Sequence, residues 1–447
     1  MISIRCVHRL SEADAYRGSI NALNLASARP DPFSTFEFYA HYLRHARAFP
    51  GGEGLRLWLL LAFGGDELVG YLALKQGSHR IFGIRASRLD LLTAYVADRP
   101  HLVTRPGDAQ RVGTAMYAYL LGRSSEWSQL EFAQQDAASA LLPPPPEATR
   151  GAFRFRQWPN MAVGIIPVRW DSPAAYFAAL SKKARSNVSR QMRALLAAGD
   201  VQLLSSSTTQ ASEALFELYR CIEPHSWKAH ADAAIGRNRQ SVDFYCGLIS
   251  DAQPMNLLIQ VLVLDGVPIA GLVSAAFGKG LYALHIVYDE RHAHLGPGSA
   301  IFWLGMRLAI EGGYEFVNLL WGSGHYKSRW LAEMREVQSL QIYRVGTPFY
   351  WRRSLGDLWR RVRGKSAVQS STLFNPVRRS VDKPVTLLAA AEAVPLPGRA
   401  ERAAHAALIQ RVRRCHGEFL STAQLAAAMP FATGPPPGVA NPGLRAR

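Results

Sequence analysis

The sequence predicts an α/β (α+β) protein with two tandem domains, whose mixed central sheets are flanked by helices, and an irregular basic C-terminal tail. The order hairpin, strand, loop, helix, strand occurs twice along the chain, which indicates a duplicated domain. The run Pro143–Pro146 separates the two occurrences, and consecutive prolines form a stiff, non-helical connector. After about Arg363 the periodic apolar pattern gives way to Ala, Arg and Pro.

Length and composition agree with this division. A chain of 447 residues exceeds what one ordinary core accommodates, so two or three domains are expected. Hydrophobic residues at 48% and charged residues at 19% exclude a disordered or fibrous chain. We predict a first domain at 1–150, a second at 151–350, and a basic, partly disordered extension at 351–447.

Each repeat is marked by a hairpin signal. Gly64-Gly65 with Asp66 lies in the first, and Asp265-Gly266 is the stronger signal in the second, because paired Asp-Gly residues adopt the turn that hairpins need. The first repeat is expected to have strands at 55–63, 68–76, 88–96 and 129–132, with helices at 35–47 and 108–121. The second is expected to have strands at 256–264, 268–277, 281–288 and 314–320, with helices at 174–198, 211–222 and 298–311.

The net charge of +17 is concentrated near the C-terminus. Residues 351–447 hold 16 Lys and Arg against 5 Asp and Glu, which places +11 on the extension. Such a tail suits an anionic membrane surface, nucleic acid or a protein partner. A solvated extension without a partner is the alternative.

The four cysteines are spread widely. Cys6, Cys221, Cys246 and Cys415 include no CxxC pair, which argues against a disulfide scaffold, a zinc finger and an iron–sulfur cluster. The chain opens without a secretory signal and contains no convincing apolar span. The predicted location is the cytoplasm, with membrane association as an option through the tail.

The loop between the strand at 281–288 and the next helix is the most informative segment. Gly296 and Gly298 let the backbone approach an anion, Pro297 stiffens the turn, and Ser299 lies in the first helical turn. A helix that opens in this way directs backbone N–H groups at phosphate or pyrophosphate. An ordinary turn is the alternative for this motif in isolation.

In context, these elements resemble the acyl-CoA-binding core of the GNAT acyltransferases. The family's basic-or-Gln-x-x-Gly-x-Gly/Ala pattern falls on Ala293 to Gly298, with Ala293 in place of the basic or amide residue. Further matching segments are Ser181–Asn187, Glu223–Lys228, Phe244-Tyr245, Ile269–Gly271, Tyr288-Asp289 and Gly322–Trp330. Together they resemble the subgroup named for cellulose-biosynthesis acetyltransferases (CelD/BcsL-like), which is related to the Fem-type aminoacyltransferases.

The resemblance implies acetyl-CoA or another acyl-CoA as co-substrate, and direct transfer of the acyl group to an amino or hydroxyl acceptor. Backbone N–H groups on the splayed strand, from His285 to Val287, would polarise the thioester carbonyl. The implied acceptor is a small molecule or saccharide, in exopolysaccharide or cell-envelope biosynthesis. A Fem-like transferase that uses aminoacyl-tRNA, and a non-catalytic tethering module, are the alternatives.

Candidate substrate-binding residues come before and after that strand in the sequence. Lys327, after Tyr326, would hold an anionic substrate or phosphate, or else be a solvated surface lysine. Trp227 and Lys228 would form a wall and an anchor of the acceptor site. Their alternative is a core tryptophan beside an exposed lysine.

The remaining candidates are acids and bases. Tyr288 would protonate the departing thiolate, or be a core tyrosine, and Asp289 would orient a base or bind a sugar hydroxyl, or cap the loop. His285 is either a general base or a satisfied core histidine. The loop histidines His292, His294 and His325 lack metal-ligand spacing, so no metal is expected.

Two further segments complete the predictions. The basic residues of the segment 182–193 spread over more than one helix face without interleaved aromatic residues, so nucleic acid is not expected to be the partner. The matching loop of the first repeat, 98–108, has a single glycine. We expect that half to be degenerate and to build one wall of the acceptor groove.

Overall fold

The computed structural model describes residues 2–46, 54–93, 97–142, 151–230, 233–251, 254–322, 325–362, 398–415 and 417–427. The predicted proline connector, Pro143–Pro146, lies outside the described residues, as do 363–397 and 428–447 of the predicted extension. Among the described helices, none combines the length and the apolar character needed to cross a membrane.

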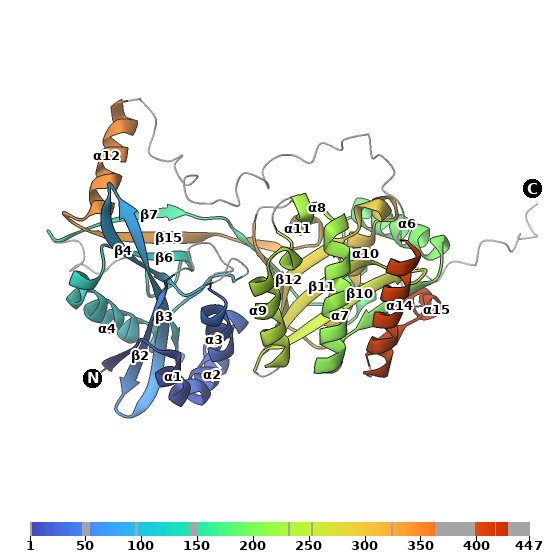
Figure 1. Ribbon diagram of the computed structural model, residues 1–447, viewed down its shortest axis with the longest axis horizontal. Coiled ribbons are helices and arrows are strands. Elements are labelled where there is room, and N and C mark those ends of the chain that lie inside the picture. Colours follow the sequence, from blue (N-terminus) through green and yellow to red (C-terminus); the bar gives the residue numbers. More distant parts are fainter. Residues whose placement is uncertain are drawn as a thin grey trace, which may run out of the picture.

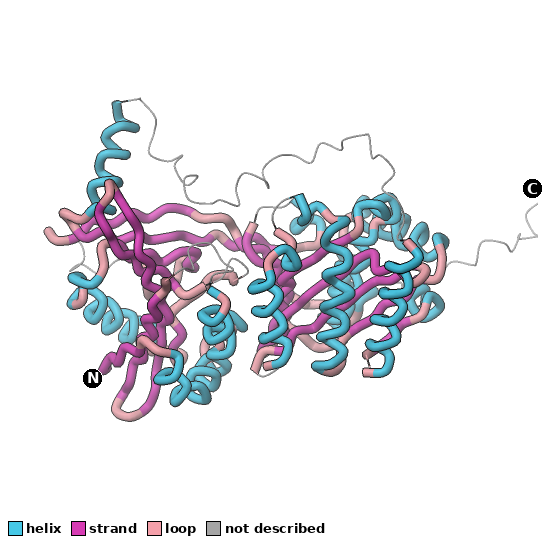
Figure 2. Tube along the Cα trace, viewed as in Figure 1, coloured by secondary structure: helices cyan, strands magenta, loops and turns pink. Residues whose placement is uncertain are grey.

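The first half is built around one mixed sheet (Figures 1 and 2). α4 (Ala109–Gly122) covers one face, while α2 (Arg17–Ala26) and α3 (Phe36–Arg44) lie on the other, toward the second half. The strand order is β1 (Ile2–Val7), β2 (Arg56–Gly64), β3 (Glu67–Ile81), β4 (Ile84–Leu91), β6 (Gln129–Asp136), β15 (Val337–Arg344) and β7 (Phe153–Pro159), with β5 (Val103–Thr104) beside β3.

The second half is a larger α/β layer (Figure 1). One face carries α7 (Thr209–Ile222), α9 (Arg239–Ser250) and α14 (Arg399–Arg414), and the other carries α5 (Pro173–Ala179), α6 (Lys182–Ala198) and α10 (Pro297–Glu311). The strand order is β14 (Glu333–Arg335), β8 (Val163–Pro167), β13 (Phe316–Trp321), β12 (Gly280–Tyr288), β11 (Val267–Phe277), β10 (Asn256–Leu264), β9 (Val201–Ser205) and β16 (Glu418–Leu420).

The predicted fold class, a mixed α/β protein with two helix-flanked sheets, is confirmed. Both hairpins form at the expected turns, as β2–β3 and β10–β11. Asp265 and Gly266 have φ values of +48° and +77°, as a tight hairpin turn with two left-handed residues requires. The local sequence signal was therefore sufficient for these elements.

The sheets do not divide at the predicted domain boundaries. The boundary at residue 150 falls between β6 and β7, which both belong to the first sheet. β15 comes directly after β14 of the second sheet in sequence, yet it inserts between β6 and β7 of the first sheet. The chain thus returns to its first half before it enters the predicted extension.

Part of that extension packs on the second half. α14 lies along α7, with Ile409 and Val412 buried in the shared core. β16 adds an edge strand beside β9, with Phe419 opposite Leu204, and α15 (Thr422–Ala427) follows it. Apolar residues spaced along one face of α14 explain why this segment of a basic region is ordered.

A common core joins the two halves. The ring of Phe33 lies 5.7 Å from that of Tyr282, and the ring of Phe38 lies 5.7 Å from that of Phe244. The hydroxyl of Tyr282 donates to the carbonyl oxygen of Pro30 at 2.9 Å. These contacts bring the first half against the start of β12.

Candidate active site

β12 and β13 diverge in the middle of the second sheet. They pair in parallel only at Gly280 with Phe316, Leu281 with Val317, and Tyr282 with Asn318. The register of β12 against β11 then shifts, because Val273 faces His285 while Ser274 faces Ala283. Leu284 is the extra residue of this bulge, and a bulge bends a strand and increases its twist. The bulge explains why β12 leaves β13 at this point.

The divergence turns backbone N–H groups of β12 toward the opening. The N–H of Asp289 donates to the carbonyl oxygen of Ile269 on β11 at 2.8 Å. Because N–H groups alternate in direction along a strand, that of Val287 also faces β11. The N–H groups of Ile286 and Tyr288 face the splayed side instead. The sequence predicts that backbone N–H groups near Val287 polarise the thioester carbonyl. The N–H groups of its neighbours Ile286 and Tyr288 are better oriented for this role than that of Val287.

The far wall of the opening is the kinked end of β13. Leu320 has φ of +58° and Gly322 has φ of +117°, and the first of these is unusual for a residue with a Cβ atom. Lys327, on α11 (His325–Arg329), donates from Nζ to the carbonyl oxygens of Leu320 at 2.7 Å and Trp321 at 3.1 Å. Burial lowers the pKa of Lys327 to about 8, although the charge of Asp98 opposes this shift. Lys327 is a buried amine and not the solvated lysine of the alternative prediction.

The first half contributes Asp98 to the same wall. Its Oδ2 accepts from Asn318 Nδ2 on β13 at 2.8 Å and from Arg99 Nε at 3.2 Å. Its Oδ1 is buried and has no hydrogen-bond partner within the described parts of the chain. A buried carboxylate oxygen in this state is costly unless it meets a ligand or water. The sequence predicts that the loop 98–108 builds the groove wall, but no motif in it singles out Asp98.

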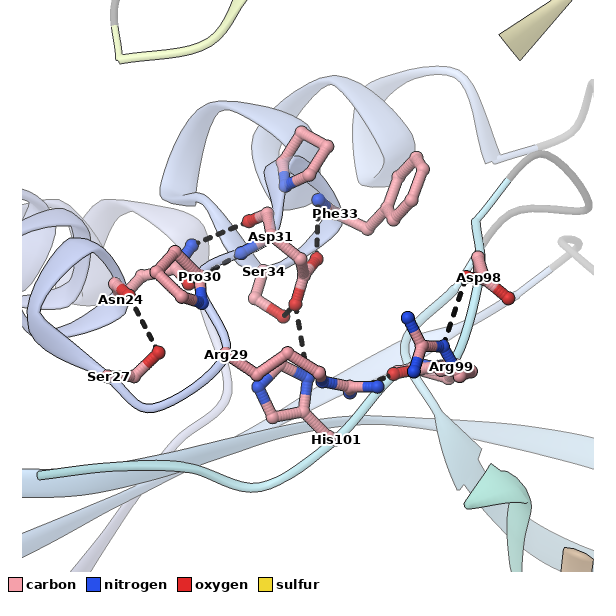
Figure 3. Close-up of polar contacts among 12 residues, drawn as sticks. Asn24, Ser27, Arg29, Pro30, Asp31, Phe33, Ser34, Asp98, Arg99 and His101 are labelled. Carbon is pink, nitrogen blue, oxygen red and sulfur yellow. Dashed lines mark hydrogen bonds and ion pairs between the residues drawn. The ribbon is translucent and has the colours of Figure 1, made fainter. Parts of the chain in front are cut away.

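A network of charged side chains fixes the loop that carries Asp98 (Figure 3). Arg29 pairs with Asp136 at 2.8 Å and also donates to the backbone carbonyl oxygen of Arg99. Arg99 in turn pairs with Asp136 at 3.1 Å. His101 Nδ1 lies 3.1 Å from Asp31, and burial lowers the pKa of His101 despite that carboxylate. The loop is held by ion pairs that span distant parts of the first half.

On β12, His285 lies in a buried polar cluster. Its Nδ1 is 3.3 Å from Lys228 Nζ, its Nε2 is 2.5 Å from the Tyr245 hydroxyl, and Lys228 also donates to the Tyr219 hydroxyl at 2.8 Å. Burial and the charge of Lys228 lower the pKa of His285 well below its usual value. Both ring nitrogens are engaged and a second proton is disfavoured, which is typical of the core histidine and not of a general base.

The alternative prediction for Trp227 and Lys228 is a core tryptophan beside an exposed lysine, and the structure shows the reverse. The Trp227 side chain is 39% exposed, whereas Lys228 is only 4% exposed. Burial lowers the pKa of Lys228 to about 8, while Glu223 opposes the shift. An exposed tryptophan and an exposed Tyr326, at 44%, are available as walls for an acceptor. Lys228 is anchored within the protein.

The glycine loop closes the top of β12. Gly296 has φ of +68°, and a Cβ atom there would lie 2.4 Å from Cδ of Gln191 on α6. A Cβ atom on Gly298 would lie 2.9 Å from the Tyr288 ring. The carbonyl oxygen of Gly296 accepts from the N–H of Ser299 at 3.0 Å, so α10 starts there. A side chain at Gly296 would have to displace Gln191 and adopt a positive φ, and a side chain at Gly298 would have to displace the Tyr288 ring, so both positions favour glycine.

Gln191 supplies an amide that the local motif lacks. In the loop, Ala293 stands where the family pattern has a basic or amide residue. In the structure the Gln191 side chain packs on Gly296, and its Oε1 is buried without a hydrogen-bond partner in the described ranges. No signal in the loop could have identified it, because it comes from a helix about a hundred residues earlier.

Asp289 is engaged as a loop cap. Its Oδ1 accepts from the backbone N–H of Arg291 at 2.9 Å, and the Arg291 guanidinium pairs with its Oδ2 at 2.6 Å. Burial raises the pKa of Asp289, but hydrogen bonds from His292 and Arg291 outweigh this and hold the pKa below its ordinary value. These contacts match the alternative prediction for Asp289, that it caps the loop. His294 is exposed, and the His325 side chain lies outside the described side chains.

Tyr288 remains available as an acid. Its ring is half-buried on the α10 face of the sheet, beside Gly298. Burial and the nearby Glu290 raise the pKa of its hydroxyl, which is therefore protonated at neutral pH. Within the described residues, no group of three or more His, Cys, Asp or Glu side chains is arranged to hold a metal ion.

Comparison with known proteins agrees with this geometry. Residues 182–328, about a third of the chain, match the family model described as an acetyltransferase (GNAT) domain. The match begins with α6 and ends beside Lys327, so it spans β12, the glycine loop and β13. The predicted GNAT domain is confirmed for residues 182–328. No curated protein sequence matches the chain.

Several solved structures are also similar to this chain. The structure of FemX has a TM-score of 0.52 with 10% identity, over 78% of this chain and 99% of that one. A conserved protein of unknown function from Bacteroides thetaiotaomicron has a TM-score of 0.47, with 13% identity over 77% and 100% of the two chains. A tandem GNAT protein from the clavulanic acid biosynthesis pathway has a TM-score of 0.43, with 14% identity over 78% and 99%. The likeness to FemX is one of fold.

Proposed function

We propose that the chain transfers an acyl group from acetyl-CoA, or another acyl-CoA, directly to an amino or hydroxyl acceptor. The observation that carries the proposal is the glycine loop beside the diverging strands, within the segment that matches the acetyltransferase domain. Acyl transfer needs a polarised carbonyl, an acid for the leaving group and an oriented nucleophile. The described residues offer a group for each.

The donor side consists of the glycine loop and the end of β12. Gly296 and Gly298 would admit the pyrophosphate close to the start of α10, with Gln191 as the amide contact. The N–H groups of Ile286 and Tyr288 would donate to the thioester carbonyl oxygen. The Tyr288 hydroxyl would give its proton to the departing thiolate.

The acceptor side consists of β13 and the first half. Asp98 Oδ1 would accept a hydrogen bond from the attacking amine or hydroxyl, and Lys327 would hold the acceptor or an anionic part of it. Trp227 and Tyr326 would line the groove as exposed aromatic walls. A saccharide fits such a groove, since aromatic rings and carboxylates together bind sugar hydroxyls and ring faces. We place the acceptor among saccharides or small molecules of envelope polysaccharide biosynthesis, as the resemblance to the CelD/BcsL-like subgroup implies.

The first experiment is calorimetric titration with acetyl-CoA and longer acyl-CoAs. We compare the wild type, Gly298→Asp and the control Gly18→Asp, because a Cβ atom on Gly18 meets nothing within 4 Å. Wild type and Gly18→Asp should bind, whereas a negative side chain at the loop should abolish binding. Thermal melting establishes that both variants are folded.

The titration can also contradict the proposal. A folded wild type that binds no acyl-CoA contradicts the proposal and favours an aminoacyl-tRNA donor or a non-catalytic tethering role. The RNA alternative has its own signature, since its affinity would fall steeply with salt as counterions are released. Binding that survives in Gly298→Asp would move the donor site away from the glycine loop.

A further inference from the structure

The helix that follows β15 carries an exposed apolar stripe. α12 (Pro348–Val362) places Trp351, Leu355, Leu358 and Trp359 at the spacing i, i+4, i+7, i+8, which lies along one helix face. Their exposed fractions are 52%, 53%, 58% and 59%, and large apolar side chains exposed in such a row mark an interaction surface.

The orientation of this stripe is fixed by the foot of the helix. Phe349 is buried in a small core with Ile81, Ala86 and Tyr343 of the first sheet. From that anchor α12 stands out at the end of the first half, beside the β3–β4 hairpin (Figure 1). The apolar stripe is therefore presented outward and is not part of either core.

The tip of the neighbouring hairpin continues the apolar surface. Phe82 lies in the β3–β4 turn and Ile84 begins β4, and they are 63% and 58% exposed. Phe82 has φ of +50°, so the turn holds a large aromatic residue in a backbone region that such residues rarely adopt. We call the set of exposed residues Phe82, Ile84, Trp351, Leu355, Leu358 and Trp359 the α12 surface.

Basic residues lie near the α12 surface, on the hairpin and beside α12. A pocket at the foot of α12 is lined by Arg154, Arg156 and Arg353 together with aromatic residues, and its one acidic lining residue, Asp357, pairs with Arg353 at 2.7 Å. Arg80 and Arg85 are exposed on the hairpin. Exposed apolar residues that include tryptophan, with arginines nearby, match the interfacial region of a bilayer with anionic headgroups.

We propose that the α12 surface docks on an anionic phospholipid bilayer. The tryptophans and leucines would enter the boundary between headgroups and acyl chains, and the arginines would contact lipid phosphates. In the view of Figure 1, α12 and the α8 (Trp227–His230) and α11 segments of the candidate site lie toward the same side of the molecule. Docking would bring the groove near the membrane. The proposal holds whether or not the chain transfers acyl groups.

Vesicle sedimentation with the full chain tests the proposal. Vesicles of phosphatidylcholine alone are compared with vesicles that also contain phosphatidylglycerol, at low and high salt. We expect binding only to the anionic vesicles, and weaker binding at high salt because salt screens the attraction.

Variants on α12 and a control on α2 locate the contact. The triple variant Trp351→Ser, Leu355→Ser, Leu358→Ser should lower the partition coefficient at least about tenfold, because apolar burial at the interface is lost. Leu355→Ser is also compared with Leu25→Ser, whose side chain is similarly exposed at 46% but lies on α2. Leu25→Ser should bind like the wild type. All four side chains are exposed, so circular dichroism and melting should be unchanged.

Three results would overturn the proposal. The first is a wild type that does not sediment with anionic vesicles, and the second is a triple variant that binds as the wild type does. The third comes from light scattering on the protein without lipid. A wild type that self-associates, with a triple variant that is monomeric, would assign the α12 surface to a second copy of the chain.

Discussion

The ammonium of Lys327 lies 2.7 Å from the carbonyl oxygen of Leu320 and closes the kink at the end of β13. Leu320 has φ of +58°, so its carbonyl is turned out of the regular sheet. A buried carbonyl without a donor costs free energy, and Lys327 supplies that donor. The same side chain thus fixes one wall of the opening between β12 and β13 and places a charged group in it.

Replacing Lys327 should weaken this wall. In Lys327→Met the carbonyls of Leu320 and Trp321 lose their donor, and we expect the free energy of unfolding to fall by about 2 kcal/mol. Urea denaturation measures the change. Ser328→Ala alters the exposed neighbouring side chain and should leave stability unchanged. A Lys327→Met protein as stable as the wild type would show that water or a backbone shift replaces the ammonium.

Asp98 should be required for the acceptor and not for the donor. Asp98→Asn preserves the shape of the side chain but removes its charge, so turnover should drop by roughly a hundredfold if the carboxylate accepts the proton of the nucleophile. Calorimetric affinity for acetyl-CoA should be unchanged. Asp136→Asn is the matched control, since Asp136 pairs with Arg99 in the same network but has no bond to Asn318. Equal loss of turnover in both variants would assign Asp98 a purely structural role.

Tyr288 should act after the donor has bound. Tyr288→Phe removes the proton proposed for the thiolate, so kcat should fall about a hundredfold or more while the affinity for acetyl-CoA is retained. Because burial raises the pKa of Tyr288, its protonation should not limit the wild-type rate at neutral pH. Tyr314→Phe, which changes another half-buried tyrosine whose pKa burial raises, is the control. Unchanged kcat in Tyr288→Phe would mean that water or another group protonates the thiolate.

Sequence patterns were sufficient where structure is local. The two hairpins, α10 and the glycine loop depend on turn residues and apolar spacing within short segments, and each forms where it was expected. The insertion of β15 between β6 and β7 could not be predicted in this way. It pairs segments about two hundred residues apart, and the strand's own pattern does not encode its neighbours.

Long-range contacts also determine which side chains of the candidate site are buried and which groups they meet. Trp227 and Lys228 are adjacent, and residue type alone favours burial of the tryptophan. Lys228 is buried because Tyr219 and His285, from other elements, provide partners for its amine. The roles of Gln191 and Asp98 likewise depend on contacts across the fold, with Gly296 and Asn318. The sequence shows which side chains could act as acids, bases or amide contacts, but it does not show which of them meet in the folded protein.

The two buried lysines should make stability depend on pH in the alkaline range. Burial lowers the pKa of both Lys228 and Lys327 from 10.5 to about 8 in the folded protein. Between these pH values the folded amine is neutral while the unfolded amine binds a proton, so unfolding takes up a proton. The free energy of unfolding should therefore rise with pH from about 8 to 10.5, by at most about 1.4 kcal/mol per pH unit for each lysine. Below pH 8 both states are protonated and this dependence disappears.

Differences between variants isolate this effect from other alkaline titrations. Burial raises the pKa of Cys6 to about 11, which acts in the opposite direction above pH 9 and is common to every variant. In Lys228→Met the free energy of unfolding should rise less steeply with pH, because one of the two lysines no longer contributes. The reduction in slope is at most about 1.4 kcal/mol per pH unit. Urea denaturation at a series of pH values between about 7.5 and 10 measures it. Lys279→Met, at a side chain that is 74% exposed, should keep the wild-type slope. A Lys228→Met slope equal to that of the wild type would mean that Lys228 keeps its proton in the folded state, with its charge stabilised by Tyr219 and Glu223.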